Sequence, residues 1–262
     1  YRTLFLSFTC PGNSCMGLDR IIRVESIYYR GSMIIPFFTL TIELSNPFQL
    51  SADDLRSFFL KKLEEYTPFY KDSPDTFIYR YPVVQCKQVK SILMVIGIGQ
   101  GAGLLQEISR GGNRILIGEN SCRITGQDKE IRKEPFGISE KTHTYEFLTP
   151  WRALNQQNAK KFYDLKGKTE RDAFMQKILT SNLKTLAKSI DYDLPEPLTC
   201  ECRVRFRRER ILHENVMVFT GTFRTNLLIP DYLGIGQSVS SGFGTIRKIT
   251  DNPGNDNEAD AV

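Results

Sequence analysis

The chain has 262 residues, of which 40% are hydrophobic and 25% are charged. This length is enough for about two ordinary domains or one large domain, and the composition is that of a soluble globular protein, which excludes disordered, collagen-like and coiled-coil proteins. The net charge of +5 is unevenly distributed: residues 250–262 contain four acidic residues and no basic ones, so the rest of the chain carries +9. A basic body of this size is compatible with a polyanionic partner, although many proteins that bind no polyanion carry a similar charge.

No segment of the sequence predicts a membrane-spanning helix. The longest apolar run, residues 91–105, contains Gln100 and four glycines, and it is shorter than the ~20 apolar residues that a spanning helix needs. Residues 1–32 lack the succession of a basic region, an apolar stretch and a small-residue cleavage site that marks a secretory signal. We therefore expect a cytoplasmic protein that has no membrane partner.

The cysteines and histidines do not form a pattern typical of a metal site. No two of the 6 cysteines have CxxC spacing, and His143 and His213 are the only histidines. Structural zinc sites need four such ligands at short, characteristic spacings. We therefore expect neither a metal nor another cofactor, and we interpret Cys200 and Cys202, which share one face of an expected strand, as small buried thiols.

Residues 33–125 predict a unit of four strands and two helices. Apolar and polar side chains alternate along residues 33–44, which is the period of a half-buried strand. The spacing of Ser51 and Asp54 is a helix-capping signal, and apolar residues at helical spacing follow it until Pro68. The other expected elements are strands at 76–89 and 91–99, a helix at 102–110 and a strand near 114–124.

Residues 142–249 repeat this order of elements. A strand at 142–149 precedes a helix that is predicted to start at a T-x-x-D cap, Thr169 and Asp172, and to bury an apolar stripe. The stripe consists of Met175, Leu179, Leu183, Leu186 and Ile190. The last expected elements are a hairpin of strands 199–208 and 215–228, a glycine-rich crossover at 231–241 and a closing strand at 242–249.

The order β-α-β-β-α-β, present twice, predicts an α+β protein of two tandem ferredoxin-like (RRM-like) domains. We place the N-terminal domain at 33–125 and the C-terminal domain at 142–249, with the seam in the polar segment 126–141. Residues 1–32 belong to neither unit and form a leader to which we assign no role. The acidic residues 250–262 are expected to be a disordered tail.

The glycine-rich segment 234–244 (GIGQSVSSGFG) is the first candidate binding site. Glycines let a backbone approach a ligand closely, and successive free N–H groups form a concavity for phosphate oxygens. The residues predicted to bind are Gly234, Gly236, Ser240, Ser241, Gly242 and Gly244. A tight crossover between two elements explains the same glycines equally well.

A strand with three arginines on one face is the second candidate. In the run RVRFR, Arg203, Arg205 and Arg207 point one way, while Val204 and Phe206 point the other way. The planar guanidinium group suits phosphate because it donates two hydrogen bonds at once. A solvated strand edge is the alternative interpretation.

Few residues are candidates for acid–base catalysis. Tyr66, Tyr70 and Lys71, in and just after the first helix, could transfer a proton and stabilise negative charge. His213, in the expected turn between two basic strands, has an ordinary pKa close to neutrality. A solvated helix face explains the first three residues equally well, and a plain surface histidine is the alternative for His213 and for His143.

Three segments carry a resemblance to a known family. Residues 219–246, from FTGTF through IPDYLGIG to SSGFGTI, resemble the C-terminal glycine-rich signature of the RAMP superfamily of CRISPR-associated proteins. Residues 81–87 (YPVVQCK) and 147–155 (FLTPWRALN) are similar to its repeat-RNA-processing endoribonuclease family. The resemblance extends over residues 33–249.

The resemblance implies two tandem ferredoxin-like domains and cleavage of precursor CRISPR RNA at one site in each repeat, without a metal ion. The 2′-hydroxyl would attack the adjacent phosphate and leave a 2′,3′-cyclic phosphate and a 5′-hydroxyl. CRISPR repeat RNA is then the expected partner, other CRISPR effector subunits are further candidates, and the protein is expected to be a monomer or a homodimer. Tyr66, Tyr70, Lys71 and His213 become the candidate catalytic residues.

One departure from the family leaves alternatives open. Many family members use a histidine in or soon after the first helix, and residues 33–125 contain none. The chain could instead be a non-catalytic protein that binds CRISPR repeat RNA, or a structural subunit whose basic strand meets an acidic protein surface. The sequence does not separate these alternatives.

Overall fold

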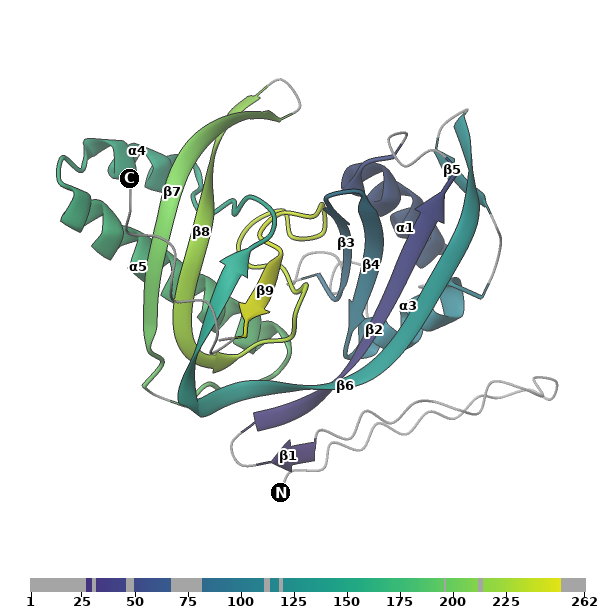
Figure 1. The fold of residues 1–262 in the computed structure, drawn as a ribbon, viewed down its shortest axis with the longest axis horizontal. Helices are drawn as coiled ribbons and strands as arrows, with labels where there is room; N and C mark the ends of the chain where they lie inside the picture. The colour runs from purple at the N-terminus through teal and green to yellow at the C-terminus, as the bar shows by residue number, and fades with distance from the viewer. Residues whose placement is uncertain are drawn as a thin grey trace, which may run out of the picture.

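The computed structural model shows two helix-covered units joined by one long strand, β6 (Asn120–Phe147), as Figure 1 shows. The described residues are 27–29, 32–45, 50–66, 82–110, 114–117, 120–195, 197–211 and 214–250. Residues 251–262 of the expected disordered tail (250–262) and most of the leader lie outside them.

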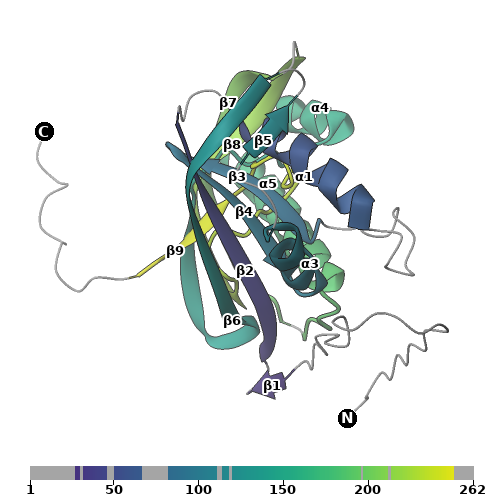
Figure 2. The same ribbon diagram turned by 90° about the vertical axis from the view of Figure 1, so that its right-hand side faces the viewer.

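The first unit has the predicted order of elements. Its strands are β2 (Ser32–Leu44), β3 (Val84–Val89), β4 (Ile92–Ile98) and the first half of β6, and its helices are α1 (Ala52–Tyr66) and α3 (Gln100–Ile108). The strands lie in the order β3-β4-β2-β6, and all neighbours are antiparallel. Both helices cover the same face of this sheet (Figure 2), where Phe38, Leu55 and Leu105 belong to one buried core.

The start of α1 confirms the predicted cap. The Asp54 amide donates to Ser51 Oγ at 3.2 Å, and the Ser51 amide donates to Asp54 Oδ2 at 2.8 Å. This reciprocal pair satisfies two amide groups that otherwise have no partner at a helix N-terminus.

Strand β6 differs most from the sequence-based expectation. The expected strand near 114–124 is a hairpin of β5 (Arg114–Ile117) and the start of β6, and the polar segment 126–141, expected as a seam, continues β6. This segment pairs with β2 from Ser32↔Gly137 onwards. Its polarity hid the strand, because Phe136 is its one buried large apolar side chain and most of the segment is held by main-chain pairing with β2.

The second unit shares β6 as its first strand. Its other elements are α4 (Gln156–Asp164), α5 (Lys168–Ser189), β7 (Cys200–Ile211), β8 (Glu214–Leu228) and β9 (Ile246–Ile249). β6 pairs with both β9 and β8, and β8 pairs with β7, always antiparallel. β6 is therefore the last strand of one ferredoxin-like unit and the first strand of the next.

The predicted hairpin is confirmed, and three other details of the second unit were wrong. The closing strand is limited to β9, because residues 242–245 are still part of the crossover. Helix α5 begins at Lys168 rather than at a Thr169 cap, since the carboxylate of Glu170 accepts the Gly167 amide at 3.3 Å. The sequence analysis also missed α4, whose first turn is capped by Asn155.

The leader is not wholly separate from the fold. Its residues Ile27–Tyr29 form strand β1, which pairs with β2. Ser32 is already the first residue of β2, so the expectation that residues 1–32 belong to neither unit is wrong for Ile27–Tyr29 and for Ser32.

A second buried core contains residues of both units, among them Phe37 of β2 and Phe219 of β8, together with buried residues of α4 and α5. It contains four residues of the predicted α5 stripe, while Ile190 is half-buried beside it. Trp151 is fully buried and stacks on Phe147 with ring centroids 5.1 Å apart. Both cysteines, Cys200 and Cys202, are free thiols on the side of this core: Cys200 is buried, as predicted, whereas Cys202 is only half-buried against it.

No helix among the described residues is both long and apolar enough to cross a membrane.

Candidate functional site

The glycine-rich segment connects β8 to β9 and lies where the two units meet (Figure 1). It runs beside β3 of the first unit: the Cys86 amide donates to the Ser240 carbonyl at 3.1 Å, and Cys86 and Ser241 form a parallel bridge. The segment also touches the first turn of α1, because a Cβ atom on Gly242 would lie 3.0 Å from the Cβ atom of Ala52. The crossover of the second unit is thus held against the first unit.

Two buried polar side chains of β3 anchor this segment. Gln85 and Lys87 both have no exposed surface. The Gln85 side-chain oxygen accepts the Gly234 amide at 3.0 Å, and Lys87 Nζ donates to the Val239 carbonyl at 3.0 Å. Because burial penalises an ammonium group, it lowers the pKa of Lys87 from 10.5 to about 7.

The glycines are required by the packing of the segment itself. Gly242 and Gly244 have φ angles of 91° and 62°, which side chains rarely adopt. A Cβ atom on Gly244 would also collide with the Ile235 carbonyl oxygen. The tight-crossover interpretation therefore accounts for these glycines without any ligand.

Part of the segment still offers main-chain donors. The amides of Gly242 and Gly244 donate to the carbonyls of Val239 and Pro150, so they are occupied. Within the described part of the chain, no protein acceptor takes up the amides of Ser238, Val239 and Ser240. Ser238 and Ser240 are half-buried and could contact a phosphate, whereas Val239 is buried and the amides of the two glycines are occupied.

Two arginines reach the same stretch from different units. Arg56 of α1 donates through Nε to Ser240 Oγ at 3.1 Å, and Arg152 donates through Nη1 to Ser238 Oγ at 2.8 Å. The Arg152 guanidinium also lies over the Phe243 ring, 5.4 Å from its centroid. These two guanidinium groups place positive charge beside residues 238–240, which suits a phosphate.

The sequence analysis did not single out these anchoring residues as site residues. Gln85, Lys87 and Arg152 were noted only within segments that carry the family resemblance, and Arg56 was not noted at all. A polar residue at an inward position of a strand is the only local signal for Gln85 and Lys87. The arginines have no local signal, because their contacts span 184 and 86 residues of sequence.

The arginine-bearing strand has the predicted geometry. Arg203, Arg205 and Arg207 of β7 are exposed and share one face, because the intervening Val204 packs towards the core. Arg207 forms an ion pair with Glu209 on the same face. Since β8 and β6 separate β7 from β9, the arginines form a second surface rather than part of the glycine-rich segment.

The predicted catalytic residues lie at the end of α1 or outside the described residues. Tyr70, Lys71 and His213 lie outside the described residues, and Tyr66 is described only as the last residue of the α1 backbone. His143 lies on β6, and burial together with Lys248 lowers its pKa. The catalytic assignments stay predictions.

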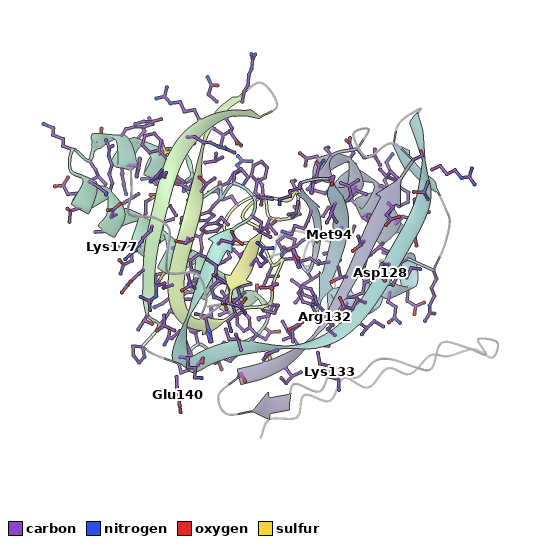
Figure 3. The ribbon with its side chains drawn as sticks, in the orientation of Figure 1. Met94, Asp128, Arg132, Lys133, Glu140 and Lys177 are labelled. Carbon is purple, nitrogen blue, oxygen red and sulfur yellow. The ribbon has the colours of Figure 1, made fainter. Side chains whose placement is uncertain are left out.

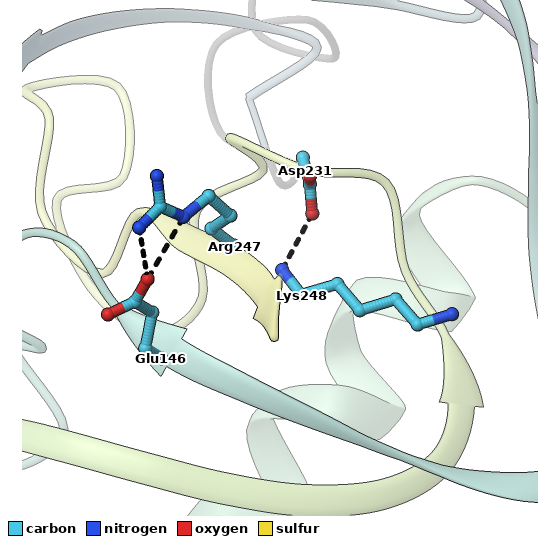
Figure 4. Close-up of polar contacts among 4 residues, drawn as sticks. All are labelled: Glu146, Asp231, Arg247 and Lys248. Carbon is cyan, nitrogen blue, oxygen red and sulfur yellow. Dashed lines mark hydrogen bonds and ion pairs between the residues drawn. The ribbon is translucent and has the colours of Figure 1, made fainter. Parts of the chain in front are cut away.

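A pocket of about 570 Å³ lies apart from both surfaces, beside β6 and β9. The pocket is lined by both basic and acidic side chains. Arg247 donates to Glu146 Oε1 through Nε at 2.9 Å, and the Asp231 carboxylate accepts the main-chain amide of Lys248 at 2.7 Å (Figure 4). Arg132, on the face of the first sheet turned away from α1 and α3 (Figure 3), also lines it. Because the carboxylates neutralise the basic groups, this pocket does not favour a polyanion.

Comparisons with known proteins identify the family. The Cas6b N-terminal domain model matches residues 33–135, and the Cas6b C-terminal domain model matches residues 137–249. Among curated proteins, the uncharacterized protein MJ0978 of Methanocaldococcus jannaschii is 30% identical over 133 residues, which are 48% of this chain and 86% of that protein.

Solved structures agree with this result. A crystal structure of Cas6b has a TM-score of 0.72 at 29% identity and covers 83% of this chain and 100% of its own. The structure of a CRISPR RNA processing endoribonuclease Cas6b has a TM-score of 0.64 at 27% identity, and the match covers 82% of this chain and 100% of that chain. A RAMP protein that binds different RNA substrates shares the fold, with a TM-score of 0.50 at 14% identity, covering 83% and 100%. The chain, which resembled CRISPR-associated RAMP endoribonucleases by its sequence motifs, therefore belongs to the Cas6b family.

Proposed function

We propose that this protein is an endoribonuclease that binds the repeats of precursor CRISPR RNA and cuts each repeat once. Membership of the Cas6b family supports the reaction, since one solved relative is named as a CRISPR RNA processing endoribonuclease. The observation that carries the proposal is the placement of Arg56, Arg152 and the open amides of Ser238 and Ser240 at the junction of the units. The proposed enzyme works in the cytoplasm as a monomer or homodimer.

The proposed chemistry is transesterification without a metal ion. A base removes the proton of a 2′-hydroxyl, the 2′-oxygen forms a bond to the adjacent phosphorus, and the bond from phosphorus to the 5′-oxygen breaks. An acid gives a proton to the leaving 5′-oxygen, so the products are a 2′,3′-cyclic phosphate and a 5′-hydroxyl. Cations stabilise the extra negative charge of the phosphorane. We assign the proton transfers to the region of Tyr66, Tyr70 and Lys71, with His213 as the other candidate.

We propose two contact surfaces for the RNA backbone. The first is residues 238–240 with Arg56 and Arg152, and the second is the face formed by Arg203, Arg205 and Arg207. Each phosphate neutralised on a single strand contributes roughly −0.7 to the log–log salt slope of binding. Changing the three arginines of β7 to Gln should therefore make this slope shallower by about 2.

Charge reversal tests the second surface more strongly. Changing the same three arginines to Glu should abolish binding of repeat RNA and leave the fold intact, because the side chains are exposed. The matched control reverses three exposed lysines on α5, on the other side of the sheet: Lys177, Lys184 and Lys188. Equal affinities of the two triple variants would refute the placement of RNA on β7.

The catalytic step is tested with end-labelled repeat RNA from the protein's own CRISPR array, in EDTA. The proposal predicts one cut in each repeat and a product that ends in a cyclic phosphate. Acid opens this ring, and phosphatase then removes the resulting phosphate group. The second candidate function, a non-catalytic repeat-RNA-binding protein, is favoured by the absence of histidine from residues 33–125. It predicts tight, repeat-specific binding and no product.

A further inference from the structure

Two aromatic rings are unusually exposed at the outer edge of the second unit. Tyr163 of α4 is 45% exposed and Phe206 of β7 is 44% exposed. Phe206 lies on the same face of β7 as Cys202 and Val204, which pack against the core. Phe206 lies further along the strand, where the core no longer covers this face. Both rings surround the buried ring of Phe162, with centroid distances of 6.5 Å from Tyr163 and 5.4 Å from Phe206.

An arginine holds one of these rings in place. The Arg208 guanidinium lies over the Tyr163 ring, 5.4 Å from its centroid, and its Nε donates to the Tyr163 hydroxyl at 3.1 Å. Arg208 is itself exposed and lies two residues after Phe206 on the same face of β7. Planar guanidinium groups and aromatic rings are the surfaces on which unpaired bases of single-stranded nucleic acids stack.

The edge that carries these residues is strongly basic. Residues 203–210 of β7 contain five arginines and one glutamate, and this glutamate, Glu209, is paired with Arg207 on the opposite face. β7 pairs with β8 on one side, and among the described residues no strand pairs with its other side. A single strand of RNA that crosses this free edge can place phosphates near Arg203, Arg205 and Arg207 and a base on the aromatic face.

We infer that Tyr163, Arg208 and Phe206 form a stacking site for one unpaired base of the bound RNA. The site requires an unstacked nucleotide of a single strand, because inside a duplex both faces of a base are covered by its stacked neighbours. This inference rests on the proposed function and goes beyond it by assigning a base contact where only backbone contacts were proposed. The surrounding arginines favour a polyanion over an apolar protein surface as the occupant.

An abasic scan of the RNA tests the inference. Repeat RNAs that lack one base at each position in turn are titrated against the parent protein and against Tyr163→Ala, and binding is followed by fluorescence anisotropy. One position should weaken binding to the parent by about 5- to 150-fold. Tyr163→Ala should bind intact RNA more weakly than the parent by the same factor. Removing the base at that position should not weaken the binding of Tyr163→Ala any further.

Two variants serve as controls. Tyr163→Trp keeps a stacking surface and should bind like the parent, whereas Ile131→Ala, at another exposed apolar residue (63% exposed), should change neither affinity nor the abasic pattern. Thermal unfolding verifies that each variant is folded.

The outcomes separate this inference from the proposed function. A parent protein without affinity for repeat RNA overturns both. If the parent protein binds repeat RNA and Tyr163→Ala binds every RNA with the same affinity as the parent, only the stacking site is overturned. The surface would then be left to a protein partner. The stacking site is also overturned if Tyr163→Ala binds more weakly than the parent but no single abasic position weakens the binding of the parent by the same factor.

Discussion

Replacing Lys87 with methionine is predicted to change how the stability of the protein depends on pH. Burial lowers the pKa of Lys87 to about 7 in the folded protein, whereas the unfolded chain has the ordinary, higher pKa. Between these two values the unfolded chain binds a proton that the folded protein does not bind. Lys87 therefore makes the free energy of unfolding rise with pH, by about 2 kcal/mol between about pH 6 and about pH 8.5.

Lys87→Met removes the titrating group and keeps most of the aliphatic side chain, so this rise should disappear. Urea unfolding followed by circular dichroism gives the free energy at each pH, and the difference between parent and variant isolates Lys87, because the other titrating groups are common to both. Lys177→Met, at an exposed residue of α5 (Figure 3), is the control and should follow the parent. Parallel curves for the parent and Lys87→Met would refute the argument that a buried ammonium anchors the glycine-rich segment.

Three further predictions concern the fold around the site. Gly244→Ala should lower the free energy of unfolding by about 2 kcal/mol or more, because a Cβ atom collides with the Ile235 carbonyl at a φ of 62°; an unchanged urea midpoint would contradict this. Ser51→Ala should lower the free energy of unfolding by about 1 kcal/mol, since it removes the acceptor of the Asp54 amide, and a thermal midpoint equal to that of the parent would oppose this assignment. Cys86, whose pKa is raised to about 12 by burial, should react with iodoacetamide far more slowly in the native protein than in urea, and equal labelling rates by mass spectrometry would show that the thiol is accessible.

The two ferredoxin-like units were predictable because their signals are local. Alternating side chains along 33–44 and the Ser51 cap need no knowledge of distant residues. The α5 stripe is equally local, and four of its five residues are buried. Strand β6 and helix α4 were missed for the opposite reason: β6 is polar and held by main-chain pairing, while α4 buries little beyond Phe162.

The candidate site was predictable only in part. The glycine-rich segment and the arginine face could be read from the sequence, because each is continuous in the chain. Whether an amide in the segment is open or occupied depends on contacts with Val239 and Pro150, and no sequence pattern reports these. The same is true of Arg56, whose partner Ser240 is 184 residues away.

The most direct test of the central claim is a cleavage assay in EDTA with repeat RNA whose nucleotide before the cut carries a 2′-deoxy sugar, beside the all-ribose RNA. We predict a single cut in the ribose RNA and none in the deoxy RNA, with both RNAs bound equally tightly, because the 2′-oxygen is the nucleophile. Tight binding with no product from either RNA would contradict the claim and make this member of the family an RNA-holding protein. A cut in both RNAs would contradict the proposed chemistry.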